Sequence, residues 1–281
     1  MGPGAMPSGL RKSSAIADFC GLPALVAAFS RSPAMLRRPS VFAPFPHLIA
    51  AESTRHGGVS PAPYASLNLG KGTDDAPEHV SENRRRFCHA LGFEPQQLAF
   101  SRQVHGAEVL RADGPGGASG FDALISDVPG VVLAVSVADC TPILVYDART
   151  GAVAAIHAGW RGTVAGIVDK ALRQMAEAYG TRGADCYAYV GTCIDECSFE
   201  VGHEVAAAFA ADFKRWDAER GKYLVDLKRA NAAQLLGFGV EAQRVQISPY
   251  STVSHRADYF SHRMEGGVTG RMMAVIGRRA G

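Results

Sequence analysis

Three side chains that could bind a soft metal ion each stand at the end of an apolar segment with the character of a strand. They are His105, Cys140 and His157, and the segments are residues 98–104, 131–137 and 152–156. Ligands of open α/β sheets collect at the carboxyl ends of the strands, so we expect the three side chains to lie close together. Two imidazoles and a thiolate suit zinc, and three protein ligands with an open fourth position are typical of a catalytic zinc site.

The same residue types allow other interpretations. A cysteine after a strand is often a small buried apolar residue, and a lone histidine there is often only hydrogen-bonded. No short-spaced pair such as C-x-x-C or H-x-x-x-H accompanies the three residues. A further alternative is that Cys140 and His157 act without metal, as a nucleophile and its base.

The turn that contains His157 could also hold an anion. Residues 157–163 include two glycines and lead into an expected helix, where free backbone N–H groups can bind a phosphate or a carboxylate. The guanidinium group of Arg161 would add charged N–H donors that can bind two oxygens of one anion. The plainer interpretation is that the glycines only form a tight turn and that Trp160 belongs to the core.

The elements that must position these residues alternate between helices and strands. Helices are expected over residues 75–90, 162–179, 203–214 and 227–236, and strands over 98–104, 131–137, 143–146, 152–156, 186–190 and 271–276. The Gly-rich stretch 114–120 reads as a loop. The run of three arginines at 84–86 indicates a solvated helix face rather than a nucleic-acid-binding patch; it consists of Arg84, Arg85 and Arg86. No break in composition divides the body, so we predict one α/β domain.

Composition limits the class of protein. The chain has 281 residues, of which 47% are apolar and 20% charged, as in ordinary globular proteins. A net charge of +2 argues against nucleic acid as the main partner. No apolar run is long enough to predict a transmembrane helix. Six cysteines without a framework pattern indicate mostly reduced thiols and a cytoplasmic location.

The first 40 residues differ from the rest. Residues 1–40 are basic and contain Pro and Ser, so we expect a flexible N-terminal tail before a catalytic domain at 41–281. Residues 20–29 weakly resemble a signal-peptide core, but Pro23 interrupts them and no clean cleavage site follows. Secretion, or a true start at Met35, is the alternative.

An ordered series of motifs then carries a family resemblance. The motifs lie at residues 53–60, 64–70, 103–106, 138–142, 157–162, 199–202, 260–263 and 269–272. Over residues 41–277 the chain resembles the laccase-domain family. Its members are also described as YfiH-like, as multicopper polyphenol oxidase, as purine nucleoside phosphorylase-type and as peptidoglycan editing factor. Ser251 and Met264 stand where members often carry Cys and Arg.

The resemblance implies a fold, a metal and a substrate class. The fold would be a single domain with mixed β-sheets flanked by helices, similar to cytotoxic-necrotizing-factor-like cysteine hydrolases. His105, Cys140 and His157 would bind a catalytic zinc, with copper possible at the same site. The activities would be phosphorolysis of adenosine, inosine, guanosine and methylthioadenosine, and deamination of adenosine. The partners would be the nucleoside and phosphate, with no nucleic acid or membrane, in a monomer or small homo-oligomer.

Four further residues are candidates for substrate binding. Arg55 and Arg161 are expected to hold phosphate, and Asn68 and Gln103 to contact sugar or base. For Asn68 the alternative is a turn that stabilises its own loop.

Three other functions stay open. One is a hydrolase or amidase that edits peptidoglycan precursors with Cys140 as nucleophile and His157 as base. Another is a metal-binding module without catalysis. The third, a copper-dependent polyphenol oxidase, is less favoured, because no two of the nine histidines form the H-x-H spacing of a multicopper cluster.

Overall fold

Two six-stranded β-sheets form the centre of the protein, whose computed structural model describes residues 34–280. The first sheet has the order β1 (Leu36–Arg37), β2 (Leu48–Ser53), β15 (Met272–Arg278), β7 (Val132–Val137), β3 (Leu98–Arg102) and β5 (Gly116–Ser119). The second has the order β14 (Val245–Ile247), β10 (Cys186–Val190), β8 (Thr141–Asp147), β9 (Val153–Ala158), β6 (Ala123–Ser126) and β4 (Val109–Arg111). Each contains parallel and antiparallel pairs, which confirms the predicted mixed sheets.

The two sheets pack face to face. Leu133, Val135 and Ile276 of the first sheet share one buried cluster with Leu144 and Val153 of the second. β7 and β8 are apolar almost throughout because each has a buried side chain on both of its faces.

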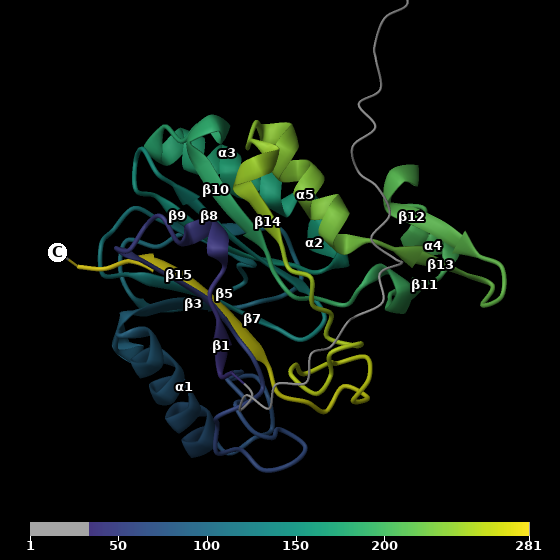
Figure 1. Cartoon of the computed structure of the whole chain (residues 1–281), viewed down its shortest axis with the longest axis horizontal. Helices are drawn as coiled ribbons and strands as arrows, with labels where there is room; N and C mark the ends of the chain where they lie inside the picture. The colour runs from purple at the N-terminus through teal and green to yellow at the C-terminus, as the bar shows by residue number, and fades with distance from the viewer. Residues whose placement is uncertain (1–33, 281) are drawn as a thin grey trace, which may run out of the picture. The chain divides into compact units, whose positions relative to one another are not determined.

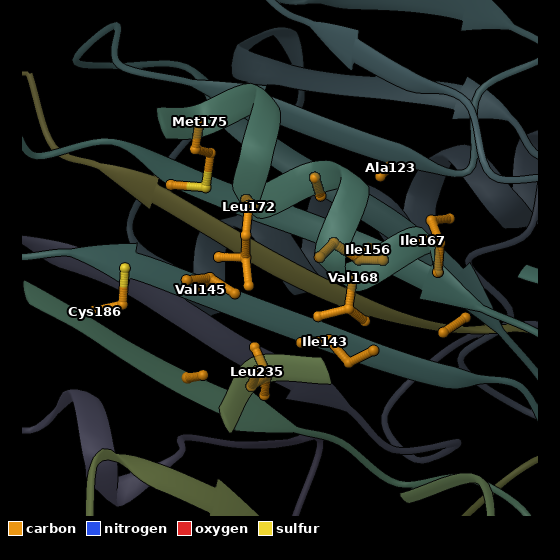
Figure 2. Close-up of a cluster of buried hydrophobic side chains, with 14 of the residues drawn as sticks. Ala123, Ile143, Val145, Ile156, Ile167, Val168, Leu172, Met175, Cys186 and Leu235 are labelled. Carbon is orange, nitrogen blue, oxygen red and sulfur yellow. The ribbon is translucent and has the colours of Figure 1, made fainter. Parts of the chain in front are cut away.

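Helices cover the outer faces of both sheets (Figure 1). α1 (Pro77–Leu91) lies on the first sheet, begins at a proline and ends at the left-handed Gly92. α3 (Ile167–Tyr179) and α5 (Leu227–Phe238) lie on the second sheet. Figure 2 shows Val168, Leu172 and Met175 of α3 facing the side chains of that sheet.

Two helix predictions need correction. The expected helix 162–179 is split into α2 (Trp160–Val164) and α3, because Gly166 between them adopts a left-handed conformation with φ 74°. The expected helix 203–214 is limited to α4 (His203–Ala206). A small sheet flanks α4 in the chain, formed by β11 (Glu200–Val201), β13 (Lys222–Val225) and β12 (Lys214–Asp217). Trp216 pairs with Tyr223 across this sheet, and such aromatic pairs favour strands.

Other segments differ more modestly from expectation. The predicted loop 114–120 contains β5, and β2, β4 and β6 had not been predicted. Short 3-10 helices complete the fold at Ser40–Phe42, Pro95–Gln97, Gly183–Asp185, Glu196–Ser198, Ala211–Phe213 and Ala242–Arg244.

The N-terminal boundary lies earlier than expected. Leu36 and Arg37 pair with Ser53 and Glu52, so these two residues of the expected tail form the edge strand β1 of the first sheet. The rest of the expected tail lies outside the described residues. Within residues 34–280, no helix is both long and apolar enough to cross a membrane.

Candidate metal and substrate site

The structure brings His105, Cys140 and His157 together. One potential ligand atom from each lies within 4.8 Å of the other two, and the two imidazole rings meet edge to face with centroids 4.9 Å apart. Atoms this close can share one ion, because zinc–ligand bonds are about 2.0 to 2.3 Å long. In the described part of the chain, this is the one group of three or more such side chains that could hold a metal ion.

Both sheets contribute to this group, which corrects the expectation of a single sheet edge. His105 follows β3 of the first sheet, and His157 lies within β9 of the second. Cys140 lies on the connection from β7 to β8, where the chain crosses from one sheet to the other. The group therefore forms where the two packed sheets meet.

Asp122, which the sequence analysis missed, holds both histidines. Its Oδ1 accepts a hydrogen bond from Nδ1 of His157 at 2.8 Å, which turns the Nε2 of that ring to the group. The same carboxylate accepts bonds from the backbone N–H groups of Val104, His105 and Gly106. Asp122 is fully buried. Such carboxylates orient metal-binding imidazoles, but a lone aspartate before an apolar strand carries no motif.

The charged forms of the Cys140 thiol and the His157 imidazole stabilise each other. Burial alone would raise the pKa of the Cys140 thiol, but His157 and His105 lower it below its ordinary value. Burial opposes the charged form of His157, yet Cys140 and Asp122 raise its pKa. Cys140 is thus favoured as a thiolate, the form that binds metals and attacks electrophiles.

The backbone around the group is tightly constrained. His105 (φ 59°) and Asp139 (φ 80°) are the non-glycine residues with positive φ in the part that the structure describes. A methyl group at Gly159 would lie 3.2 Å from both Cys140 Sγ and His105 Cδ2. At Gly162 it would lie 2.7 Å from the carbonyl oxygen of Gly106. The glycines of this turn therefore allow a close approach to the donor group.

The donor group opens into a cavity of about 880 Å³. Six cationic side chains line it: Lys71, Arg84, Arg102, Arg161, Arg263 and Arg271. The acidic residue among its lining is Asp139, whose carboxylate accepts bonds from the Thr252 hydroxyl and the Arg263 backbone. Trp160 and Phe199 also line the cavity and offer aromatic faces. This lining suits a flat ring together with an anion.

Two of the four predicted substrate-binding residues line the cavity. Arg161 is one of them, and its side chain is exposed. Its guanidinium lies 4.4 Å from the centroid of the Trp160 ring. Gln103 lines it as well, but its amide exchanges two 2.8 Å hydrogen bonds with the backbone of Ser136 on β7.

The other two lie outside the cavity lining. Asn68 is fully buried and accepts bonds from the backbone N–H groups of Gly70 and Arg271, which fits the alternative of a loop-stabilising residue. Arg55 forms an ion pair with Glu265 at 3.0 Å and bonds the carbonyl of Ala65. Neither residue is placed to contact a ligand in this cavity. Five of its six cations had not been singled out from the sequence as substrate-binding residues: Lys71, Arg84, Arg102, Arg263 and Arg271.

Comparisons with known proteins agree on one family. A family model described as multi-copper polyphenol oxidoreductase laccase matches residues 49–279. The purine nucleoside phosphorylase of Deinococcus radiodurans is 44% identical over 251 residues, covering 88% of this chain and 94% of the relative. The purine nucleoside phosphorylase YfiH of Escherichia coli is 40% identical over 232 residues, covering 81% and 92%. The crystal structure of YlmD from Geobacillus stearothermophilus is similar with a TM-score of 0.83 and 34% identity, covering 90% of this chain and 99% of that one.

Proposed function

The chain belongs to the multi-copper polyphenol oxidoreductase laccase family, and we propose that it is a zinc-dependent enzyme of the purine nucleoside phosphorylase type. The observation that carries the proposal is the donor group of His105, Cys140 and His157 at a cation-lined cavity. Relatives that cover most of the chain are named for this activity.

The donor set fits a zinc ion. It offers two imidazoles and a thiolate, and Asp122 fixes the ring of His157 so that Nε2 faces the other donors. Three protein donors with an open position are typical of catalytic zinc sites, although copper can occupy the same donors. When bound, zinc would supply a Lewis acid that polarises a substrate atom or lowers the pKa of a water.

For phosphorolysis, the protein must bring an anion to a sugar. An oxygen of phosphate forms a bond to the ribose C1′ atom while the bond from C1′ to the purine nitrogen breaks. The electron pair of that bond goes to the purine, which takes up a proton. The cationic side chains that line the cavity would hold phosphate and balance its charge. Trp160 and Phe199 would stack against the purine.

We extend the proposal to deamination of adenosine at the same site. Water adds to the purine carbon that carries the amine, ammonia leaves, and inosine is the product. The reaction needs no phosphate, so it is separable from phosphorolysis by experiment.

A product analysis tests both reactions. Purified protein of measured metal content would be incubated with adenosine, inosine, guanosine or methylthioadenosine, with and without phosphate. We expect phosphate-dependent release of the purine base and phosphate-independent inosine from adenosine. Both should be lost in Cys140→Ala and kept in Arg85→Gln, whose side chain pairs with Glu82 on the surface of α1. No product from zinc-loaded protein would contradict the proposal.

A second candidate is a hydrolase or amidase acting on peptidoglycan precursors. The observation in its favour is that Cys140, His157 and Asp122 stand in the order of a nucleophile, its base and an orienting carboxylate. The Cys140 thiolate would attack a carbonyl to form a thioester, the amine would leave with a proton from His157, and water would release the acid.

Metal removal separates the two candidates. A cysteine hydrolase should keep its activity on a peptidoglycan-type amide after chelation, whereas nucleoside phosphorolysis should stop. Oxidase chemistry of the multicopper kind is not proposed, because within residues 34–280 one three-residue donor group is present where several would be needed.

A further inference from the structure

Arg84 is a buried cation that faces the cavity. Its side chain comes from α1, is 6% exposed, and lines the same cavity as the donor group. Its Nε donates to the carbonyl of Leu69 at 2.9 Å, and no acidic side chain of the described residues pairs with it. A buried charge without a counter-charge is costly, so a partner is expected from outside the chain.

A second cation lies beside it. Nζ of Lys71 lies 4.5 Å from the centroid of the Phe100 ring, and the guanidinium carbon of Arg84 lies 5.1 Å from the same centroid. Burial and the nearby Arg84 both lower the pKa of Lys71, and burial lowers that of Arg84 to about 10. Two cations held over one ring repel each other, and a bound anion would relieve this repulsion.

The two arginines that follow on α1 are already paired, which sets Arg84 apart from them. Arg85 and Arg86, the next residues on α1, both form ion pairs with Glu82. They occupy the solvated face that the sequence predicted for all three arginines. Arg84 departs from that prediction because its helical position points toward Phe100 of β3.

We propose that Lys71 and Arg84 form a phosphate-binding subsite at the Phe100 end of the cavity. Its ligand is a phosphate dianion, because two adjacent cations match a doubly charged oxyanion better than a carboxylate. The claim that this phosphate is the co-substrate of phosphorolysis rests on the proposed function. The claim that phosphate binds at Lys71 and Arg84 does not depend on that function.

The subsite is within reach of the donor group. Phe100 precedes His105 by five positions on one strand and its extension. At about 3.3 Å per residue, the chain between them spans at most roughly 17 Å. Arg271 links the subsite to the donor group, because it lines the same cavity and interacts electrostatically with Cys140. One cavity can therefore hold phosphate at one end and a nucleoside toward the other.

Direct binding of two phosphate compounds tests the subsite. Calorimetry at fixed ionic strength would compare inorganic phosphate with adenosine 5′-phosphate on the full chain. The proteins would be the native form, Arg84→Met, Lys71→Met and the surface control Arg85→Met. Lys71 is an exposed loop residue, so its variant should fold even if Arg84→Met does not. Thermal unfolding with and without phosphate would accompany each measurement.

We expect Arg84→Met and Lys71→Met to weaken phosphate binding by about tenfold or more, with Arg85→Met unchanged. Phosphate should raise the unfolding temperature of the native protein more than that of either variant. Binding of adenosine 5′-phosphate alone, weakened by the same substitutions, would identify a phosphate carried by the substrate. Native-like phosphate binding in folded Lys71→Met and Arg84→Met would overturn the subsite.

Kinetics separate this inference from the proposed function. If nucleoside phosphorolysis occurs, the KM for phosphate should rise in both variants while the KM for nucleoside changes little. Turnover with an unchanged phosphate KM would overturn the subsite and leave the function standing. Phosphate binding that depends on Lys71 and Arg84 in a protein without turnover would keep the subsite and refute the function.

Discussion

Nδ1 of His157 donates a 2.8 Å hydrogen bond to Oδ1 of Asp122, and the same buried carboxylate binds the backbone N–H of His105. One side chain thereby fixes two of the three donors. It holds His157 by its ring and His105 by its backbone, which adopts the unusual φ of 59°. The proposed metal site thus depends on a residue that does not itself belong to the donor group.

Asp122→Asn should therefore weaken metal binding without removing a donor. An amide cannot accept all the hydrogen bonds that the carboxylate accepts, so His157 should lose its fixed orientation. We expect metal affinity to fall about 10- to 100-fold, as for other residues behind metal ligands. A competition titration with a chelating dye measures this. Asp113→Asn, which removes an exposed carboxylate paired with Arg111, is the control and should bind metal as the native protein does.

Gly159→Ala should disturb the donor group by steric contact. The new methyl group would lie 3.2 Å from Cys140 Sγ and from His105 Cδ2, although the backbone φ of −70° suits alanine. We expect nucleoside turnover to fall about tenfold to a hundredfold, because small misplacements at a site are costly. Gly237→Ala adds the same methyl group where nothing lies within 4 Å. It should keep full activity and gain roughly 0.5–1 kcal/mol in α5.

Metal removal should expose Cys140 to alkylation. Bound metal protects a thiolate, and after chelation Cys140 should react readily, because His157 and His105 lower its pKa despite burial. Burial raises the pKa values of Cys88, Cys186 and Cys193 to about 12, so these thiols should stay unmodified in the folded protein. Peptide mapping after iodoacetamide treatment shows which of the four cysteines has been alkylated. Equal labelling of Cys140 with and without chelator would count against metal ligation.

Glu52 should make stability depend on pH. Burial raises its pKa above the ordinary value of 4.5, although Tyr189 and Thr192 donate hydrogen bonds to its carboxylate. The fold therefore binds the proton more tightly than the unfolded chain does. Between 4.5 and the raised pKa, the free energy of unfolding should fall as pH rises, by up to about 1.4 kcal/mol per pH unit.

Urea unfolding at a series of pH values tests this for native protein and Glu52→Gln. The substitution should flatten the profile in that window, because glutamine does not titrate. Glu177→Gln, on the exposed face of α3, should leave the slope unchanged. A native profile without a fall above pH 4.5 would refute the prediction.

Much of the fold was predictable because its strands are long and apolar. Segments such as 131–137 and 186–190 are buried on both faces and read as continuous hydrophobic runs. Failures came where long-range pairing decided the structure. The small sheet of β11, β12 and β13 was not predicted, because its strands are short and are stabilised by cross-strand contacts such as that of Trp216 with Tyr223.

The candidate site was likewise predictable from the sequence only in part. His105, Cys140 and His157 could be proposed because their residue types imply metal binding and each ends an apolar run. Asp122 and Arg84 could not, because nothing in the sequence tells a buried carboxylate or guanidinium from an exposed one. Asn68 and Arg55 stand in family motifs, yet their polar atoms support loops around the cavity.

The most direct test of the central claim is the stoichiometry of products from inosine. Zinc-loaded protein would be incubated with inosine and phosphate, and hypoxanthine, ribose 1-phosphate and free ribose would be quantified beside Cys140→Ala and Arg85→Gln. Phosphorolysis at the donor group predicts hypoxanthine and ribose 1-phosphate in equal amounts, only with phosphate present, and lost in Cys140→Ala alone. Free ribose in place of ribose 1-phosphate, or equal turnover by Cys140→Ala, would contradict it.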